Sequence, residues 1–336
     1  MIDVARWPAR AFFLIGAPRC GTNALSLALA QHPQVCFSEP REPHYFSRVS
    51  GEVDLARLER EYIRPFFRQE RLSRAILAEG SCSYLYSPTA LRTIDRMFPG
   101  ARFLVMVRNP LDMLPSYHAR CVFTLDEDVA EFEEAWRLQG RRAQGQSIPP
   151  RCRDARMLQY AEIGRVGARL ADLIDLVGRD RVNVVVMEDF ALSSRAVYRE
   201  VLKFLELPDD GRTDFPRRNG TKAYRSQTIQ RLLMRPPRLA RSLVAPQTVG
   251  PSHPGTVGRL IKRLRQANIV RTRWQPLGLP MRRELADCLR DDVELLGRLL
   301  NRDFREWLDD KAPPVVATSH DRGLAPAALG RVARSG

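Results

Sequence analysis

The sequence is poor in lysine and in histidine. Only four of its 54 basic residues are lysine (Lys203, Lys222, Lys262 and Lys311), and it contains five histidines. Arginine therefore carries nearly all of the positive charge, and its planar guanidinium binds phosphate and sulfate oxygens through two parallel hydrogen bonds. The net charge of +15 favours an anionic partner: a phosphorylated nucleotide, an acidic glycan, nucleic acid or an anionic membrane surface. Charge alone does not choose among these, and genome composition explains most of the arginines equally well.

Cysteine pairs and metal-binding patterns are missing as well. The cysteines form no CxxC pair and have no histidine nearby at metal-ligand spacing; they are Cys20, Cys36, Cys82, Cys121, Cys152 and Cys288. We therefore expect a reducing compartment and no structural zinc. The one apolar run near the N-terminus, residues 11–15, ends at Gly16 and Pro18 and is too short for a signal peptide or a membrane span. The sequence thus predicts a soluble cytoplasmic protein.

Short apolar runs alternate with helical stretches along the chain. Residues 11–15 (AFFLI) are continuously apolar, as expected of a strand buried on both faces of a parallel sheet. Further strands are predicted at 75–78, 103–107 and 182–187, and helices at 24–30, 55–67, 89–97, 111–121, 157–177, 195–205 and 282–300. This alternation predicts an α/β fold with a doubly wound, P-loop-like parallel sheet flanked by helices, whose ligand lies beyond the carboxyl ends of the strands.

We expect one domain over residues 1–310, with an α/β core at about 11–226 and a helical C-terminal part at about 227–310. Residues 236–280 are rich in Pro, Gly and Arg and have poor periodicity, so we expect a long excursion that is mobile without ligand. Residues 311–336 contain few large apolar side chains, which predicts a disordered tail.

The loop after the first strand has the spacing of a phosphate-binding loop. It reads GAPRCGTN, and its glycines, Gly16 and Gly21, are separated as in a P-loop, which presents backbone N–H groups and a helix N-terminus to an anion. Thr22 and Asn23 replace the lysine and the magnesium-binding hydroxyl of an ATP-binding loop, so ATP chemistry is disfavoured. Arg19 supplies a cation within the loop, where it would stabilise negative charge on a leaving-group oxygen.

A second motif follows a later predicted strand. The segment 102–110 reads RFLVMVRNP and leads into a predicted helix that carries Ser116. Pro110 suits the first helical position, and Ser116 lies about two turns further along the helix. Together with the glycine loop, this arrangement resembles that of sulfotransferases that use 3′-phosphoadenosine 5′-phosphosulfate (PAPS). The resemblance extends from about residue 11 to residue 226, with a weaker match at 301–307.

The resemblance implies PAPS as the cofactor, 3′-phosphoadenosine 5′-phosphate (PAP) as the product, and no requirement for a metal. In the family Arg108 and Ser116 would hold the 3′-phosphate, and the basic loop at 218–226 would close over the nucleotide, with Lys222 or Arg225 capping the 3′-phosphate. The phosphosulfate would be bound by Gly16, Pro18, Arg19, Cys20, Gly21, Thr22 and Asn23.

The segment 39–46 (EPREPHYF) resembles the KEPHFF stretch of heparan-sulfate-type and many bacterial sulfotransferases. The resemblance implies that Glu42 is the general base, with His44 as the second candidate because its ordinary pKa suits proton transfer. The segment 78–84 (AEGSCSY) resembles a family stretch that faces the same cleft, so Glu79 and Ser83 would contact the acceptor; structural roles at a strand end are equally compatible. The lysine of that stretch is absent here, as Gly80 takes its place.

These motifs predict transfer of a sulfuryl group to a hydroxyl group of a saccharide, a glycolipid or another small metabolite. Two alternatives belong to other classes, a P-loop kinase and a basic nucleic-acid-binding protein. The kinase lacks a clear magnesium-binding carboxylate after a later strand, and no RNP-like aromatic pair or zinc module supports nucleic-acid binding. The acceptor and the oligomeric state are not encoded in any pattern that we recognise.

Overall fold

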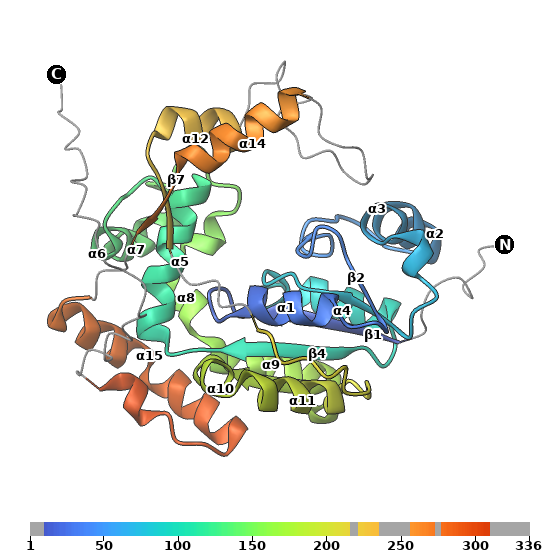
Figure 1. Cartoon of the computed structure of the whole chain (residues 1–336). Coiled ribbons are helices and arrows are strands. Elements are labelled where there is room, and N and C mark those ends of the chain that lie inside the picture. The colour runs from blue at the N-terminus through green and yellow to red at the C-terminus, as the bar shows by residue number, and fades with distance from the viewer. Residues whose placement is uncertain (1–9, 216–220, 235–255, 273–276, 310–336) are drawn as a thin grey trace.

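The computed structural model describes residues 10–215, 221–234, 256–272 and 277–309. Its centre is a sheet of five parallel strands in the order β2-β3-β1-β4-β5. The strands are β1 (Ala11–Gly16), β2 (Val35–Phe37), β3 (Ile76–Glu79), β4 (Arg102–Val107) and β5 (Val182–Val186). Helices cover both faces of this sheet (Figure 1), which confirms the predicted doubly wound α/β fold.

Continuous apolar sequence places β1 in the middle of the sheet. All six of its residues are buried, and it pairs with β3 on one side and with β4 on the other. Because both faces are covered by helices, the strand has no need of the alternating polar pattern of a half-exposed strand. The four predicted strands are all present. The sequence did not reveal β2, whose three residues are too few to show a period.

The longer helices agree well with those predicted. They are α1 (Thr22–Ala30), α4 (Pro88–Met97), α5 (Pro110–Thr124), α9 (Val166–Val177), α11 (Ser194–Phe204) and α15 (Leu279–Leu300). Helices that the sequence did not predict are α6 (Phe132–Arg137), α7 (Gln139–Ala143), α10 (Met187–Leu192), α12 (Gln227–Met234) and the 13-residue α14 (Thr256–Asn268).

Two predicted helices are more irregular than their sequences indicated. The stretch 55–67 consists of α2 (Leu55–Leu58), a π-helical turn over Glu59–Ile63, and α3 (Arg64–Phe66). The stretch 157–177 is divided into a 3₁₀ turn at Ala155–Leu158, α8 (Tyr160–Gly164) and α9. Apolar periodicity detects which residues face the core, but it does not detect these interruptions of the backbone ladder.

A second, two-stranded antiparallel sheet joins β6 (Thr221–Tyr224) to β7 (Ile269–Thr272). Its strands enclose α12 and α14, so the described parts of the predicted 236–280 excursion contain regular structure and return to the basic loop. Residues 235–255 and 273–276, and the predicted tail at 311–336, lie outside the described residues. Within the described residues no helix is long and apolar enough to cross a membrane.

The C-terminal helix α15 packs along α9 and caps it. The side chain of Asp292 accepts hydrogen bonds from the backbone N–H groups of Gly167 and Ala168, both at 2.8 Å. The residue at the N-cap of α9, Arg165, makes no such bond, so a carboxylate from another helix satisfies two of its free N–H groups. A Cβ atom on Gly167 would lie 2.3 Å from the carbonyl oxygen of Asp292, so glycine permits this close approach.

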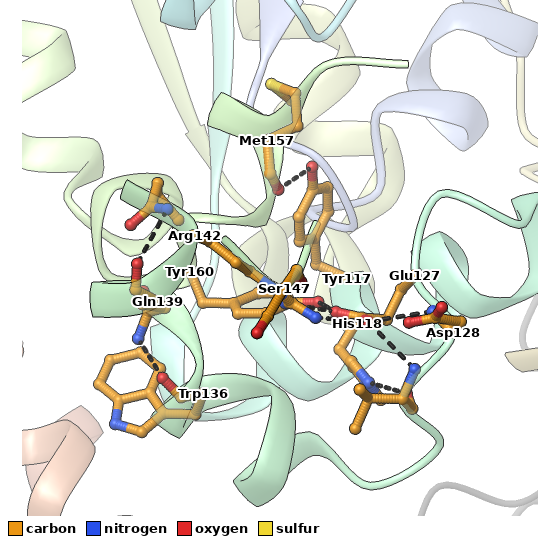
Figure 2. A network of polar contacts seen from close by, with 12 residues as sticks. Tyr117, His118, Glu127, Asp128, Trp136, Gln139, Arg142, Ser147, Met157 and Tyr160 are labelled. Atoms are coloured by element: carbon orange, nitrogen blue, oxygen red, sulfur yellow. Dashed lines mark hydrogen bonds and ion pairs between the residues drawn. The ribbon is translucent and has the colours of Figure 1, made fainter. Parts of the chain in front are cut away.

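The segment after α5 is organised around a buried ion pair (Figure 2). Arg142 donates two hydrogen bonds to Glu127, at 2.7 and 2.8 Å, and neither side chain is exposed. Tyr160 donates a third bond to the same carboxylate at 2.7 Å. Since the charge of each partner is met by the other, the pair holds residues 126–147 against α8 without leaving a lone buried charge.

Candidate active site

The loop after β1 and the loop after β4 lie at the switch point of the sheet, where the chain connections run in opposite directions across the strands. From β1 the chain moves toward β2, whereas from β4 it moves toward β5. Ligands of doubly wound proteins bind at such a switch point, beyond the carboxyl ends of the strands. The N–H group of Ala17 donates to the carbonyl oxygen of Met106 at 2.7 Å, which joins the loop after β1 to the end of β4.

Backbone geometry shapes the glycine loop for an anion. Gly21 is the N-cap residue of α1 and has φ 88°, a conformation that residues with a side chain rarely adopt. No side chain caps the helix, so its first N–H groups remain directed at the loop. Arg19 also has positive φ, at 66°. The loop thus presents a helix N-terminus and a guanidinium at the same place.

Arg19 links the two predicted anchors of the nucleotide. Its Nε atom donates to Ser116 Oγ at 2.9 Å, and the Arg108 guanidinium donates to the carbonyl oxygen of Arg19 at 3.4 Å. Burial lowers the pKa of Arg19, and the positive charges of Arg120 and Arg108 lower it further. An arginine keeps its charge under these conditions, so the close cations make this a site that favours an anion.

Carboxylates support the second anchor from the side of the core. Glu188, in the first turn of α10, accepts a hydrogen bond at 3.4 Å from the N–H group of Asn109, the N-cap residue of α5. Burial raises the pKa of Glu188 and of Asp112, while the nearby charge of Arg108 lowers both. Arg108 therefore contacts the glycine loop and also stabilises the negative charge of Glu188 and Asp112.

Two further loop residues contact the segments 39–46 and 78–84. Arg41 donates to Asn23 Oδ1 at 2.9 Å, and Thr22 Oγ1 lies 3.4 Å from Cys82 Sγ. Burial raises the pKa of the Cys20 thiol to about 12, so this residue remains protonated and acts through its backbone and its size.

Glu42 and His44, the two candidates for the base, lie side by side. Their closest atoms, Glu42 Oε2 and His44 Nε2, are 3.5 Å apart, and the other ring nitrogen of His44 is hydrogen-bonded to Ser83 Oγ at 2.8 Å. The N–H group of His44 donates to Ser81 Oγ at 2.8 Å, which fixes the backbone at this position. Glu42 is 43% exposed and open to an incoming hydroxyl, whereas His44 is held on both sides. The geometry permits either residue to accept a proton.

Glu79 is buried in the core, unlike the exposed Glu42. Its carboxylate is fully buried and accepts hydrogen bonds from Tyr62 at 2.7 Å and from Tyr84 at 3.0 Å. Burial raises its pKa to about 7. These contacts favour a structural role for Glu79 over contact with the acceptor. Ser83 is hydrogen-bonded to His44 and to Ser47, beside the candidate base.

The predicted basic loop is fixed by a residue that the sequence did not indicate. Asn268, at the end of α14, accepts from the N–H groups of Arg225 and Ser226 at 2.8 and 2.9 Å and donates to Gln230 Oε1 at 3.2 Å. The side chain of Arg225 is exposed, and that of Lys222 lies outside the described part of the chain. Their contacts with a nucleotide stay predictions.

Arg41 and Arg120 are further cations that the sequence analysis missed. Arg120 lies four residues after Ser116 on α5, one helical turn along the same face, so the helix period would have indicated it. Arg41 adjoins Glu42 in the EPREPH segment, but only the tertiary structure shows its bond to Asn23.

Comparisons with known proteins agree with this arrangement. A sequence model described as "Sulfotransferase family" matches residues 11–211. Human carbohydrate sulfotransferase 15 is 24% identical over 244 residues, which cover 58% of this chain and 43% of that protein, and the rat protein of the same name gives the same figures. This chain therefore matches less than half the length of these relatives. A solved sulfotransferase structure from Alicyclobacillus acidocaldarius has a TM-score of 0.59 at 23% identity, covering 89% of this chain and 98% of that one, which shows a shared fold.

Proposed function

The chain belongs to the sulfotransferase family, and from this premise we propose that it transfers the sulfuryl group of PAPS to a hydroxyl group of an acceptor. The observation that carries the proposal is the convergence of Arg19, Arg108 and Ser116. Arg19 lies on the loop after β1, whereas Arg108 follows the neighbouring strand β4 and Ser116 lies on the helix α5 that comes next. Arg19 contacts both of the other residues. Two cations beside a helix N-terminus suit a ligand with two separate anionic groups.

In the proposed reaction the acceptor oxygen attacks sulfur in line with the bridging oxygen of the phosphosulfate. The new sulfur–oxygen bond forms as the old one breaks, PAP leaves, and the hydroxyl proton passes to the base. Arg19 would stabilise the charge that develops on the bridging oxygen, and the N–H groups at the start of α1 would bind the 5′-phosphate. The hydrogen bond from Arg19 to Ser116 would have to rearrange when the ligand enters.

Glu42 is our proposed base, because its carboxylate is exposed beside the loop and is supported by His44 at 3.5 Å. His44 would orient Glu42, and its bond to Ser83 would fix the imidazole ring. The same contacts also allow the opposite assignment, in which His44 is the base and Glu42 orients it.

A saccharide is the acceptor class that we favour. The support is the name of the curated relatives, carbohydrate sulfotransferases, at 24% identity over part of their length. The segment 126–147, held by the buried pair of Arg142 and Glu127, follows directly from the helix that carries Ser116 and is where we expect contacts to the acceptor.

Ligand-induced stabilisation tests the donor. A ligand that binds only the folded state raises the melting temperature, so PAP should raise it while ATP with magnesium should not. A larger rise with ATP and magnesium would instead support the kinase alternative. Labelled PAPS offered with a panel of saccharides and phenols would then identify the acceptor.

A further inference from the structure

Positive charge is concentrated in one stretch of this chain. Residues 215–281 contain 14 lysines and arginines and neither aspartate nor glutamate, whereas the remainder of the chain contains 40 basic and 39 acidic residues. Nearly the whole net charge of +15 therefore resides in this stretch. Neighbouring positive charges repel one another, and an anionic partner removes that repulsion.

The described part of the stretch forms a small unit with a fixed base. The ladder between β6 and β7 and the hydrogen bonds of Asn268 hold the two ends together. Gln230 also donates to the carbonyl oxygen of Phe123 at 2.7 Å, which attaches α12 to the end of α5. Beyond this base α12 and α14 pack on each other and lie away from the parallel sheet (Figure 1).

Both helices of this pair, α12 and α14, expose apolar as well as basic side chains. In α12, Gln230 and Leu233 are buried, which leaves Ile229 and Leu232 outward, at 37% and 53% exposed. In α14, Leu264 is 45% exposed. Arg231 and Arg263 are exposed next to these leucines in the sequence. Water is a poor environment for three such apolar side chains on two adjoining short helices.

We propose that the helical pair is a docking surface for an anionic lipid bilayer. Arginines would bind the lipid phosphates while Ile229, Leu232 and Leu264 enter the boundary between headgroups and acyl chains, as in helices that lie on a membrane. A nucleic acid or an acidic polysaccharide would match the charge, but it would leave the leucines in water. The inference extends beyond sulfuryl transfer and does not depend on it.

Vesicle flotation with the full chain tests the proposal. Vesicles of equal parts phosphatidylcholine and phosphatidylglycerol should bind the protein, pure phosphatidylcholine should bind it far less, and added salt should weaken binding. Leu232→Glu and Leu264→Glu should each lower the partition coefficient by about tenfold or more, because each places a negative charge at the lipid face. Arg263→Glu should have an effect of similar size without altering any apolar contact.

Matched substitutions elsewhere provide the controls. Leu192→Glu on α10 changes a leucine that is 85% exposed, and Arg92→Glu changes an exposed arginine of α4. Both should bind vesicles like the unaltered protein, and circular dichroism should show native helix content in every variant compared. Equal binding to neutral vesicles, no binding to anionic ones, or an equal loss in the controls would overturn the proposal. So would binding to duplex DNA or heparin that competes with vesicles and is unaffected by the leucine substitutions.

Discussion

Arg19 joins the two predicted halves of the donor site through its contacts with Ser116 and Arg108. It lies on the glycine loop with positive φ, and its side chain reaches Ser116 on α5. Burial lowers the pKa of Arg19, and the nearby positive charges of Arg120 and Arg108 lower it further. These neighbouring cations make the site favourable for negative charge. Substitutions of Arg19, of the paired Glu42 and His44, and of the buried Glu79 therefore report on different properties of the site.

Replacing Arg19 should abolish most turnover while leaving the fold intact. Arg19→Ala removes the cation beside the leaving group, and the loss of such a group costs roughly 3 kcal/mol or more of transition-state stabilisation. Arg19→Lys should retain part of the activity because it keeps a positive charge. Steady-state rates with labelled PAPS measure both effects, and a wild-type rate for Arg19→Ala would refute the assignment.

The base is identified by comparing Glu42→Gln with His44→Asn. Loss of a general base lowers the rate by about 10²-fold to 10⁴-fold, so Glu42→Gln should reduce kcat within this range while PAP affinity changes little. His44→Asn should have a smaller effect, because we expect His44 to orient the carboxylate. If His44→Asn is inactive and Glu42→Gln is active, the histidine is the base.

Glu79 should make the protein less stable as the pH rises. Its pKa is raised from the ordinary 4.5 to about 7, chiefly by burial. Between these two values the unfolded chain has already lost the proton that the folded protein keeps, so the free energy of unfolding falls with increasing pH, by roughly 3 kcal/mol in total. Glu79→Gln does not titrate and still accepts from Tyr62 and Tyr84. It should therefore exceed the wild type in stability at about pH 8, with the gap closing toward about pH 5.

Urea unfolding of both proteins across this pH range measures the difference. A gap that does not vary with pH would show that the carboxyl group of Glu79 keeps an ordinary pKa in the folded protein.

At the level of elements, the junction of β4 and α5 brings Arg108 and Ser116 to the switch point. Asn109 caps α5 by accepting from the N–H group of Leu111 at 2.9 Å, and Pro110 occupies the first helical position, where no N–H group is needed. Glu188 of α10 accepts from the N–H group of Asn109, which ties the start of α5 to the end of β5. The direction of α5, and with it the position of Ser116, is therefore set by three elements together.

This junction predicts selective loss of affinity for the 3′-phosphate. Arg108→Ala and Ser116→Ala should weaken PAP binding much more than binding of adenosine 5′-phosphosulfate, which lacks that phosphate. Titration calorimetry with the two ligands measures the ratio. An equal loss for both ligands would show that these residues do not bind the 3′-phosphate.

Across the whole molecule, α15 unites the C-terminal part with the sheet domain. It begins 68 residues after the family match ends, since that match covers 11–211 and the helix starts at 279. Its Asp292 nonetheless caps α9, and its apolar face is buried. This packing supports the prediction that residues 1–310 form one domain.

Removing the shared cap should lower the stability of the entire chain. Asp292→Ala leaves two N–H groups of α9 without partners and should cost about 2 kcal/mol. Asp287→Ala on the exposed side of the same helix, where the aspartate pairs with Arg290, should have little effect. Calorimetry should show a single transition that Asp292→Ala shifts downward as a unit. Two separate transitions would contradict a single domain.

The sequence alone determined the features that depend on neighbouring residues. Continuous apolar runs identified β1, β3, β4 and β5, because a strand covered on both faces needs no polar alternation. The glycine loop and the Arg-Asn-Pro sequence at residues 108–110 were recognisable because their chemistry requires particular residues at fixed spacing. The sequence also singled out Glu42 and His44 as alternative candidates for the base, whereas their 3.5 Å contact came from the structure.

Only the tertiary structure decided which of these groups meet. The contact of Arg19 with Ser116 joins residues 97 positions apart and depends on the strand order, which no local pattern records. The burial of Glu79 between two tyrosines likewise depends on packing, so its sequence position was compatible with substrate contact and with support alike. β2 was missed because three residues reveal no period, and β6 and β7 because their sequences, TKAY and IVRT, contain charged residues and are not continuous apolar runs. In all three strands a partner strand satisfies the backbone groups.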